Sequence, residues 1–337
     1  MKAARLHEFN ATLKIEDVPV PDLKTGEVLV RIAGSGACHS DLHLMSGAMP
    51  IPLPITLGHE NAGYVEEVGP GVSELKKGDP VAVYACWGCG RCRFCRQGED
   101  QLCTAGNFAG ITTQGGYAEY LLVPHPRNLM ALHGIDPVDA ASLTDAGLTT
   151  YRAIRKALPF LYPGSSAVFL GLGGLGHLAV QIMRAVSPST RIIGVDVSVE
   201  KLQMALRLGA HDVVDGRGDV AGEIRKLTDG EGAQAIFDLV GSDATMKTAA
   251  ASFSRKGIIV VVGAGGGTLP YASSWLQFET VVTGSVWGSR TELEEVLALA
   301  TAGRIKPHTQ KFPLEEINEV FDLMKRGQLL GRAVITP

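Results

Sequence analysis

The six residues from Gly171 to Gly176 read GLGGLG, and they constrain the fold more than any other stretch of the chain. They follow a strand-like apolar run, AVFL, and precede a helical pattern that opens at His177. In a strand–turn–helix unit the first glycine allows a tight turn, the second lets the backbone approach a pyrophosphate, and the third lets helix and strand pack closely. The loop therefore predicts a dinucleotide-binding βαβ unit. Its cofactor-contacting residues are Gly171, Gly173, Gly174, Leu175 and Gly176.

An acidic residue extends this motif. Asp196 ends the next apolar run, RIIGVD, 20 residues after Gly176. A carboxylate at this place accepts hydrogen bonds from the ribose hydroxyls and repels a 2′-phosphate. The pattern favours NAD over NADP. A plain glycine turn followed by an unrelated strand-end Asp is the simpler alternative.

The arrangement of apolar runs divides the 337 residues into more than one domain. Short runs separated by Gly and Pro, such as EVLVRIAG and YAEYLLVP, predict an antiparallel β-rich domain over residues 1–146. Over residues 147–286, six strand-like runs alternate with helical patterns and predict an α/β fold with a doubly wound parallel sheet. Residues 287–337 contain two further helical patterns and a final apolar run, RAVIT.

Charge and hydropathy argue against several classes of function. The formal net charge of −4 offers no basic face, so we expect no nucleic-acid partner. The start, MKAARLHEFNATLKIEDV, has no apolar signal region, and no apolar run is long enough to span a bilayer. We therefore expect a cytoplasmic protein without a membrane partner. In that compartment clustered cysteines are metal ligands more often than disulfides.

Five of the six cysteines lie within residues 86–103. Four of them share a C-x₂-C-x₂-C-x₇-C spacing: Cys89, Cys92, Cys95 and Cys103. This spacing can wrap one tetrahedral zinc ion, and four thiolates leave no position for water, so such a site is structural. An iron–sulfur cluster and a thiol redox centre are the alternatives, although the Cys-Pro that ends a ferredoxin run is missing. Cys86 is left over, and a small buried side chain is its simpler interpretation.

Three polar residues from separate segments form a mixed ligand set. Cys38 lies in SGACHSD, His59 in LGHE and Asp145 in the otherwise apolar ASLTDAGLT. A thiolate, an imidazole and a carboxylate, together with water, make up a catalytic zinc site. The simpler alternatives are a buried cysteine, a hydrogen-bonded core histidine and an aspartate that caps the following helix. The residues alone leave both interpretations open.

Taken together, these motifs resemble the zinc-containing alcohol dehydrogenases of the medium-chain dehydrogenase/reductase family. GHENAGYVEEVGPGV resembles the zinc signature of the family, and the cysteine loop matches its structural-zinc lobe at about residues 86–104. GLGGLG with Asp196 matches its coenzyme fingerprint. The resemblance covers essentially the whole chain. It implies a GroES-like catalytic domain, a Rossmann NAD-binding domain and a C-terminal return to the catalytic domain.

The resemblance also implies a catalytic zinc site. Cys38, His59 and Asp145 correspond to its ligands, and an aspartate in TDAGLT is typical of the bacterial secondary-alcohol dehydrogenases. Glu60 corresponds to a residue that approaches the zinc when water is displaced. The family thus implies two zinc ions per chain, one catalytic and one structural.

Further residues acquire roles through the same resemblance. Ser40 corresponds to the hydroxyl that takes the alcohol proton, and His43 to the histidine that relays it to solvent. Trp287 corresponds to an aromatic residue of the substrate-pocket wall. The implied coenzyme contacts beyond the glycine loop are His39, Lys201, Leu239, Val240, Val262, Gly263 and Arg332.

The implied activity is the reversible, NAD-linked oxidation of a small alcohol, secondary or aromatic, to a ketone or aldehyde. A polyol, threonine or formaldehyde–glutathione dehydrogenase of the same fold is the first alternative. A non-catalytic dinucleotide-binding protein is the second. We expect a homo-oligomer and favour a tetramer over a dimer.

Overall fold

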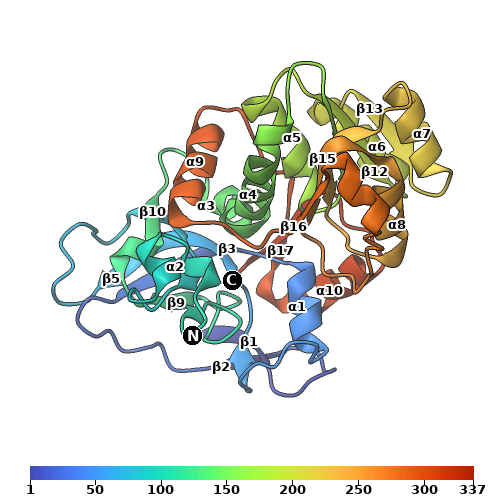
Figure 1. Ribbon diagram of the computed structural model, residues 1–337. Helices are drawn as coiled ribbons and strands as arrows, with labels where there is room; N and C mark the ends of the chain where they lie inside the picture. The colour runs from blue at the N-terminus through green and yellow to red at the C-terminus, as the bar shows by residue number, and fades with distance from the viewer. The chain divides into compact units, whose positions relative to one another are not determined.

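Two units, each built around its own sheet, make up residues 1–337 in this computed structural model (Figure 1). The first unit comprises Met1–Leu148, Gly288–Gly303 and Pro307–Pro337. The second comprises Thr149–Trp287 with Arg304–Lys306. The chain therefore leaves the first unit and later returns to it. The predicted α/β class, with one β-rich and one parallel-sheet domain, is confirmed.

The first unit contains most of the short strands. They are β1 (Lys2–Leu6), β2 (Lys14–Asp17), β3 (Val28–Gly36), β4 (Ile55–Thr56), β5 (Glu60–Val68), β6 (Pro80–Val83), β7 (Cys86–Trp87), β8 (Asn107–Phe108), β9 (Tyr120–Val123), β10 (Leu129–Ala131), β17 (Thr309–Pro313) and β18 (Arg332–Thr336). The main sheet has the order β10-β6-β5-β3-β18-β17, and β9 also pairs with β3. Because β18 pairs with β3 at Val334 and Gly36, the C-terminal segment completes a sheet begun near the N-terminus.

The helices of this unit are α1 (His39–Met45), α2 (Arg93–Arg96), α3 (Pro137–Ser142), α9 (Arg290–Thr301) and α10 (Ile317–Lys325). A π-helical turn, Leu143–Gly147, follows α3. The apolar residues of α10 recur at helical spacing, so Ile317, Val320 and Phe321 are buried on one face. They pack in a core that includes Leu44 of α1 and Tyr117.

The second unit contains the six parallel strands that the sequence predicted. They are β11 (Ser166–Leu170), β12 (Arg191–Asp196), β13 (Asp212–Asp215), β14 (Ala233–Asp238), β15 (Phe253–Val261) and β16 (Val281–Gly284). Their order is β13-β12-β11-β14-β15-β16. Every residue of β11 is buried, which explains the apolar run AVFL that follows Ser166. The strand order reverses between β11 and β14, and in such sheets ligands bind at the carboxyl ends of the strands beside that point.

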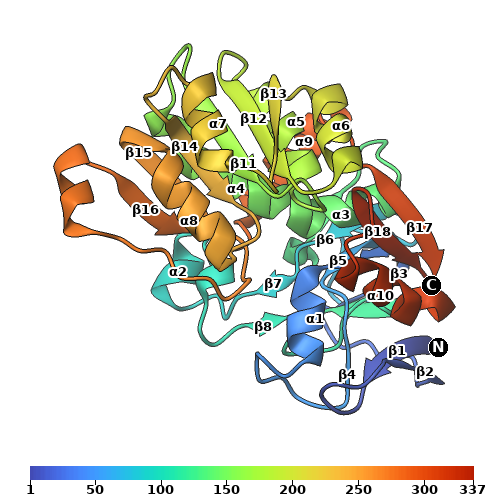
Figure 2. The ribbon, with the colours of Figure 1, turned by 90° about the vertical axis from the view of Figure 1, so that its right-hand side faces the viewer.

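Helices cover both faces of this parallel sheet. They are α4 (Leu148–Ala157), α5 (Gly176–Val186), α6 (Val199–Leu208), α7 (Val220–Leu227) and α8 (Asp243–Ser252). α5 packs against α6 and α7 against α8. Figure 2 shows α7 and α8 in front of the strands and α5 behind them. Short 3₁₀ turns complete the structure at Asp100–Leu102, Pro126–Asn128, Leu158–Phe160, Ser273–Phe278 and Leu314–Glu316. None of the helices has the length and hydropathy that a membrane span requires.

Candidate functional site

The segment CHSD folds into the junction between β3 and α1. Cys38 is the N-cap residue of α1, with an extended backbone, and its side chain is buried. The Cys38 N–H donates to Asp41 Oδ2 at 3.0 Å, so the carboxylate in the first helical turn ties down the start of the helix. This local arrangement fixes the direction of the Cys38 side chain.

The residues predicted as ligands of a catalytic metal come together from separate segments. The donor atoms of Cys38, His59, Glu60 and Asp145 all lie within 4.8 Å of one another. Asp145 Oδ2 is 3.5 Å from His59 Nε2 and 3.8 Å from Cys38 Sγ. Thiolate, imidazole and carboxylate ligands on one tetrahedral zinc would be about 3.4–3.6 Å apart. The donor set and its spacing therefore fit a zinc ion.

Asp145 reaches this cluster from an unusual backbone conformation. It lies inside the π-helical turn Leu143–Gly147, all of whose residues are buried. A π turn adds a residue to the helical ladder and is common at functional sites. The turn runs on into α4, and the Asp145 carboxylate faces Cys38 and His59.

Asp41 forms a second layer behind the cluster, which the sequence interpretation did not assign. Its Oδ1 lies 3.3 Å from His59 Nδ1, and its side chain is fully buried. Such a carboxylate orients a ligating imidazole and increases its basicity. Burial by itself lowers the pKa of His59, but the carboxylates of Asp41 and Asp145 outweigh it and hold that pKa well above its usual range. The available sequence signal was the acid three residues after Cys38.

Glu60 is paired with Arg332, the first residue of β18. Arg332 Nε donates to Glu60 Oε2 at 2.9 Å, and its Nη2 donates to Oε1. Arg332 Nη2 also lies 3.9 Å from Asp145 Oδ2. Burial raises the pKa of Glu60 to about 7, while the guanidinium of Arg332 opposes that rise. Arg332 therefore lies beside the metal cluster, and its expected contact with a coenzyme stays a prediction.

The predicted proton-relay residues lie on α1. Ser40 Oγ is 3.6 Å from Cys38 Sγ. Ser40 and His43 are half-buried and three residues apart, so they share one face of the helix. His39 is exposed at the start of the same helix. The structure thus brings Ser40 to the metal cluster and places His43 one turn further along.

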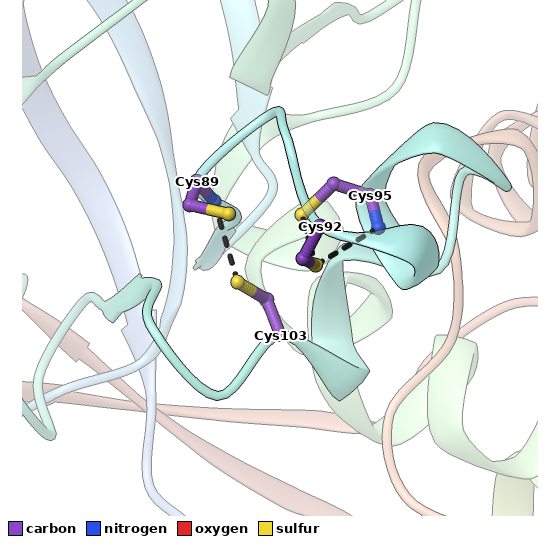
Figure 3. A group of neighbouring side chains, drawn as sticks. All are labelled: Cys89, Cys92, Cys95 and Cys103. Atoms are coloured by element: carbon purple, nitrogen blue, oxygen red, sulfur yellow. Dashed lines mark hydrogen bonds between the residues drawn. The ribbon is translucent and has the colours of Figure 1, made fainter.

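The four regularly spaced cysteines form a second cluster, in which the sulfur atoms point toward one another (Figure 3). All lie within 4.8 Å of one another, and Cys92 Sγ is 3.5 Å from Cys95 Sγ. All six cysteines of the chain are free thiols. Sulfurs on one tetrahedral zinc would be about 3.8 Å apart. A multinuclear iron–sulfur cluster needs wider spacing, because its cysteines bind different irons. One zinc ion fits best.

Backbone N–H groups stabilise these thiolates. Cys89 N donates to Cys103 Sγ and Cys95 N donates to Cys92 Sγ, both at 3.4 Å. The N–H groups of Arg91 and Cys92 lower the pKa of Cys89 to about 6. A thiol with a lowered pKa is deprotonated near neutral pH, as a metal ligand must be.

A partly buried ion pair connects this lobe to α9. Asp100 is fully buried, and Arg290 Nε lies 3.1 Å from its Oδ2. Burial, followed by the Asp100 carboxylate, raises the pKa of the neighbouring Cys95. Sequence interpretation missed this pair, because Arg290 lies far along the chain. Cys86 is fully buried in β7, as its simpler interpretation expects.

The glycine loop has the local geometry that its sequence suggests. Gly171 has φ +96°, a conformation that favours glycine. A β-carbon on Gly176 would lie 2.2 Å from the carbonyl oxygen of Gly171, so helix and strand meet without a side chain. A β-carbon on Gly173 would meet nothing within 4 Å. The first and third glycines are therefore required for the fold, and the second leaves the backbone accessible.

Asp196 lies beside this loop at the end of β12. Its Oδ2 accepts a hydrogen bond from Leu172 N at 2.8 Å and its Oδ1 accepts one from Ser198 N at 2.9 Å. These contacts fix the carboxylate against the second residue of the glycine loop. Lys201, the other predicted ribose contact, is half-buried in α6.

The remaining predicted coenzyme contacts follow neighbouring strands. Leu239 and Val240 come after β14, and a β-carbon on Gly171 would lie 2.6 Å from Val240 Cγ2. Val262 and Gly263 come after β15, and both donate to the carbonyl oxygen of Asp238. These residues therefore gather with the glycine loop at the carboxyl edge of the sheet. Trp287 is buried with φ +43°, and its role in a pocket wall stays a prediction.

Comparison with known families identifies two matching domain models. Residues 24–134 match the family model described as "Alcohol dehydrogenase GroES-like domain". Residues 174–302 match the one described as "Zinc-binding dehydrogenase".

Relatives of similar length are found among curated proteins and solved structures. The NAD-dependent alcohol dehydrogenase of Sulfurisphaera tokodaii is 42% identical, over 100% of both chains. The D-arabinose 1-dehydrogenase (NADP(+)) of Saccharolobus solfataricus is also 42% identical, over 100% of this chain and 97% of the relative. The crystal structure of the alcohol dehydrogenase from Aeropyrum pernix superimposes with a TM-score of 0.96 at 43% identity, over 100% of both chains.

Two glycine substitutions should separate folding from cofactor binding. Gly176→Ala should lower the free energy of unfolding by about 2 kcal/mol, because its β-carbon collides with backbone. Gly173→Ala should fold normally but weaken NADH binding about tenfold or more, because its methyl group occupies the approach to the pyrophosphate. Denaturant titration and NADH fluorescence titration measure the two effects. Equal NADH affinity in Gly173→Ala and wild type would contradict this assignment.

Substitution in the cysteine loop should remove one metal ion. Cys92→Ser should reduce the zinc content by one ion per chain. It should also lower the free energy of unfolding by about 4 kcal/mol where free zinc exceeds its Kd a thousandfold. Elemental analysis and chemical denaturation measure these changes. Cys86→Ser is the matched control, because Cys86 is buried outside the cluster and should keep both ions. Full zinc content in Cys92→Ser would rule out this ligand set.

Proposed function

Because the chain belongs to the zinc-containing alcohol dehydrogenase family, we propose that it catalyses the reversible, NAD-linked oxidation of an alcohol to a ketone or aldehyde. The observation that carries this proposal is the convergence of Cys38, His59 and Asp145 beside Ser40. Three such ligands leave a tetrahedral metal with a position for substrate. We propose a secondary or aromatic alcohol as the substrate.

The two clusters would hold two zinc ions, one catalytic and one structural. Cys38, His59 and Asp145 would hold the catalytic ion, and the pairing of Glu60 with Arg332 keeps that carboxylate engaged elsewhere. The structural ion would be held by Cys89, Cys92, Cys95 and Cys103. When bound, the catalytic zinc supplies Lewis-acid polarisation of the alcohol hydroxyl, and NAD supplies the hydride acceptor.

The residues of α1 would move the proton. Ser40 Oγ, next to Cys38 Sγ, accepts the proton of the substrate hydroxyl. His43, on the same face of the helix, passes it to solvent. A hydroxyl can donate and accept at once, so Ser40 can transfer the proton without becoming charged.

NAD is the coenzyme that the second unit favours. The Asp196 carboxylate, fixed by Leu172 N and Ser198 N, lies where it would bond ribose hydroxyls and repel a 2′-phosphate. We propose that the glycine loop binds the pyrophosphate, and that Leu239, Val240, Val262 and Gly263 flank the nicotinamide. His39, Lys201 and Arg332 would contact the phosphates or the ribose. Trp287 would border the substrate.

We also propose that two domains carry out different parts of the reaction. Residues 1–146 and 287–337 would form the catalytic domain, and residues 147–286 the coenzyme domain. The change of unit after Leu148 and again after Trp287 supports this division.

A second candidate function is the oxidation of a sugar or another polyol. It is favoured by the Saccharolobus solfataricus relative, which is named D-arabinose 1-dehydrogenase (NADP(+)) and is 42% identical. Threonine and formaldehyde–glutathione oxidation belong to the same group of alternatives. On this chain, these reactions would differ in substrate while using the same proposed zinc ligands.

A substrate screen with zinc analysis tests the main proposal. The purified protein would be offered secondary alcohols, aromatic alcohols, sorbitol, threonine, D-arabinose and S-hydroxymethylglutathione, each with NAD and with NADP. We expect two zinc ions per chain and reduction of NAD by secondary or aromatic alcohols. kcat/KM should be at least about tenfold higher with NAD, a difference of about 1.4 kcal/mol, because the Asp196 carboxylate would repel the 2′-phosphate of NADP. Preference for D-arabinose would favour the second candidate, and no turnover with both ions bound would favour a non-catalytic protein.

The same assay with Ser40→Ala tests the proposed proton transfer. Loss of the hydroxyl should lower turnover about 100-fold, the usual contribution of general acid–base catalysis, while both zinc ions are retained. Ser46→Ala is the matched control, because Ser46 lies at the other end of α1 and is exposed. Unchanged turnover in Ser40→Ala would show that the proton takes another route.

We further propose that the protein is a cytoplasmic homo-oligomer, with a tetramer favoured over a dimer. Strand β16 lies at the edge of the parallel sheet, and its Val281 and Val282 are exposed. An apolar edge strand favours pairing with another chain, and closed symmetric assemblies are the usual result. The free thiols suit a reducing compartment. Light scattering should give the mass of four chains, and a monomer mass would contradict the proposal.

A further inference from the structure

Asp41 contacts both of the ligand-bearing segments at the catalytic metal cluster. Its Oδ2 accepts the N–H of Cys38 at 3.0 Å, and its Oδ1 lies 3.3 Å from His59 Nδ1. The orientation of this one carboxylate therefore affects two predicted ligands at once. Hydrogen-bond donors around a buried carboxylate hold it in one orientation.

Tyr117 provides a donor from outside the cluster. Its hydroxyl donates to Asp41 Oδ2 at 2.6 Å, and the carbonyl oxygen of Gly36 lies 3.1 Å away. A phenol has a single hydrogen, and a charged acceptor at the shorter distance is the stronger partner. The hydrogen is therefore directed at the carboxylate.

The Tyr117 ring is held rigidly in place. It is fully buried and packs edge to face against Phe321 of α10, with 6.1 Å between the ring centroids. Its backbone N–H donates to the carbonyl oxygen of Leu57. A β-carbon on Gly58, the residue before His59, would lie 2.8 Å from the Tyr117 ring. Tyr117 thus touches the chain that leads into His59 and also the carboxylate behind its imidazole.

We propose that Tyr117 is a positioning residue for the catalytic metal, acting through Asp41 on His59 and Cys38. It sets the rotamer of the Asp41 carboxylate and thereby the orientation of the two ligands. The inference rests on the proposed function, because it assumes that this cluster binds zinc. Tyr117 would therefore affect how firmly the catalytic zinc is retained, as well as the rate of turnover.

Zinc release from the holoenzyme tests this inference. Tyr117→Phe should keep the ring packing and remove only the hydroxyl. With two zinc ions loaded, excess chelator should extract the catalytic ion about tenfold faster than from wild type. Loss of a residue that supports a metal ligand typically lowers metal affinity about 10- to 100-fold, and tenfold is the lower end of that range. Release from the cysteine loop should be unchanged. Cys38→Ser, which lacks a catalytic ligand, identifies the release phase that belongs to the loop.

A matched control removes a different buried hydroxyl. Tyr84 is also fully buried, and its hydroxyl donates to the carbonyl oxygen of Gly288 at 2.8 Å. Tyr84→Phe should lose similar stability in a thermal melt but release the catalytic zinc at the wild-type rate. Cobalt(II) in place of zinc adds a spectroscopic check, because altered ligand geometry in Tyr117→Phe should shift the visible d–d bands.

The outcomes separate this inference from the proposed function. Wild-type release kinetics and an unchanged cobalt spectrum in Tyr117→Phe would overturn the inference and leave the proposed function intact. Equally fast release from Tyr84→Phe would also overturn it, since the cause would then be general destabilisation. A wild-type chain that binds zinc only in the cysteine loop would overturn both.

Discussion

The burial of opposite charges around one point is the constraint on which the first unit depends. Asp41, Glu60 and Arg332 are buried with His59 and Asp145 next to Cys38. Charges removed from water are costly unless each finds a partner of opposite sign. Arg332 on β18 provides a guanidinium for Glu60 on β5, and β3 lies between these strands in the sheet. The C-terminal segment is therefore bound to the N-terminal part by the same charges that prepare a metal site.

The two cysteine-containing clusters have opposite requirements: the loop cluster fills all four metal positions, and the catalytic cluster leaves one open. They also differ in how far apart their ligands lie in the chain. The four cysteines of the loop come from a stretch of fifteen residues, Cys89–Cys103, and their thiolates complete a tetrahedron locally. The catalytic cluster draws on a helix start, a strand start and a π-helical turn that lie far apart in the sequence. A site assembled from distant elements can keep a coordination position open, because the surrounding core holds its ligands in place. The densest group of cysteines is thus the structural one.

The sequence was most informative where the chemistry is local. The glycine loop, Asp196 and the cysteine spacing are short patterns, and their structural context follows from a few neighbouring residues. The family resemblance supplied Cys38, His59 and Asp145 as a set, and the structure brings them together. Sequence reasoning did not assign Asp41 or Tyr117, and it placed Arg332 near a coenzyme without its pairing to Glu60. Only the contact between Asp41 and Cys38 is local. The contacts of Asp41 with His59 and Tyr117, and of Arg332 with Glu60, join residues remote in the chain, so no local pattern reveals them.

By itself the sequence determined the alternation of strands and helices, the dinucleotide loop and the tetrahedral cysteine site. These follow from hydrophobic periodicity and from ligand spacing, both of which act over a few residues. Only the tertiary structure decided which carboxylates lie behind His59, which cation neutralises Glu60, and which hydroxyl fixes Asp41. The physical reason is that a buried charge is satisfied by whatever group the packed core brings within hydrogen-bonding distance. That group is set by the topology of the sheet and not by nearness in the chain.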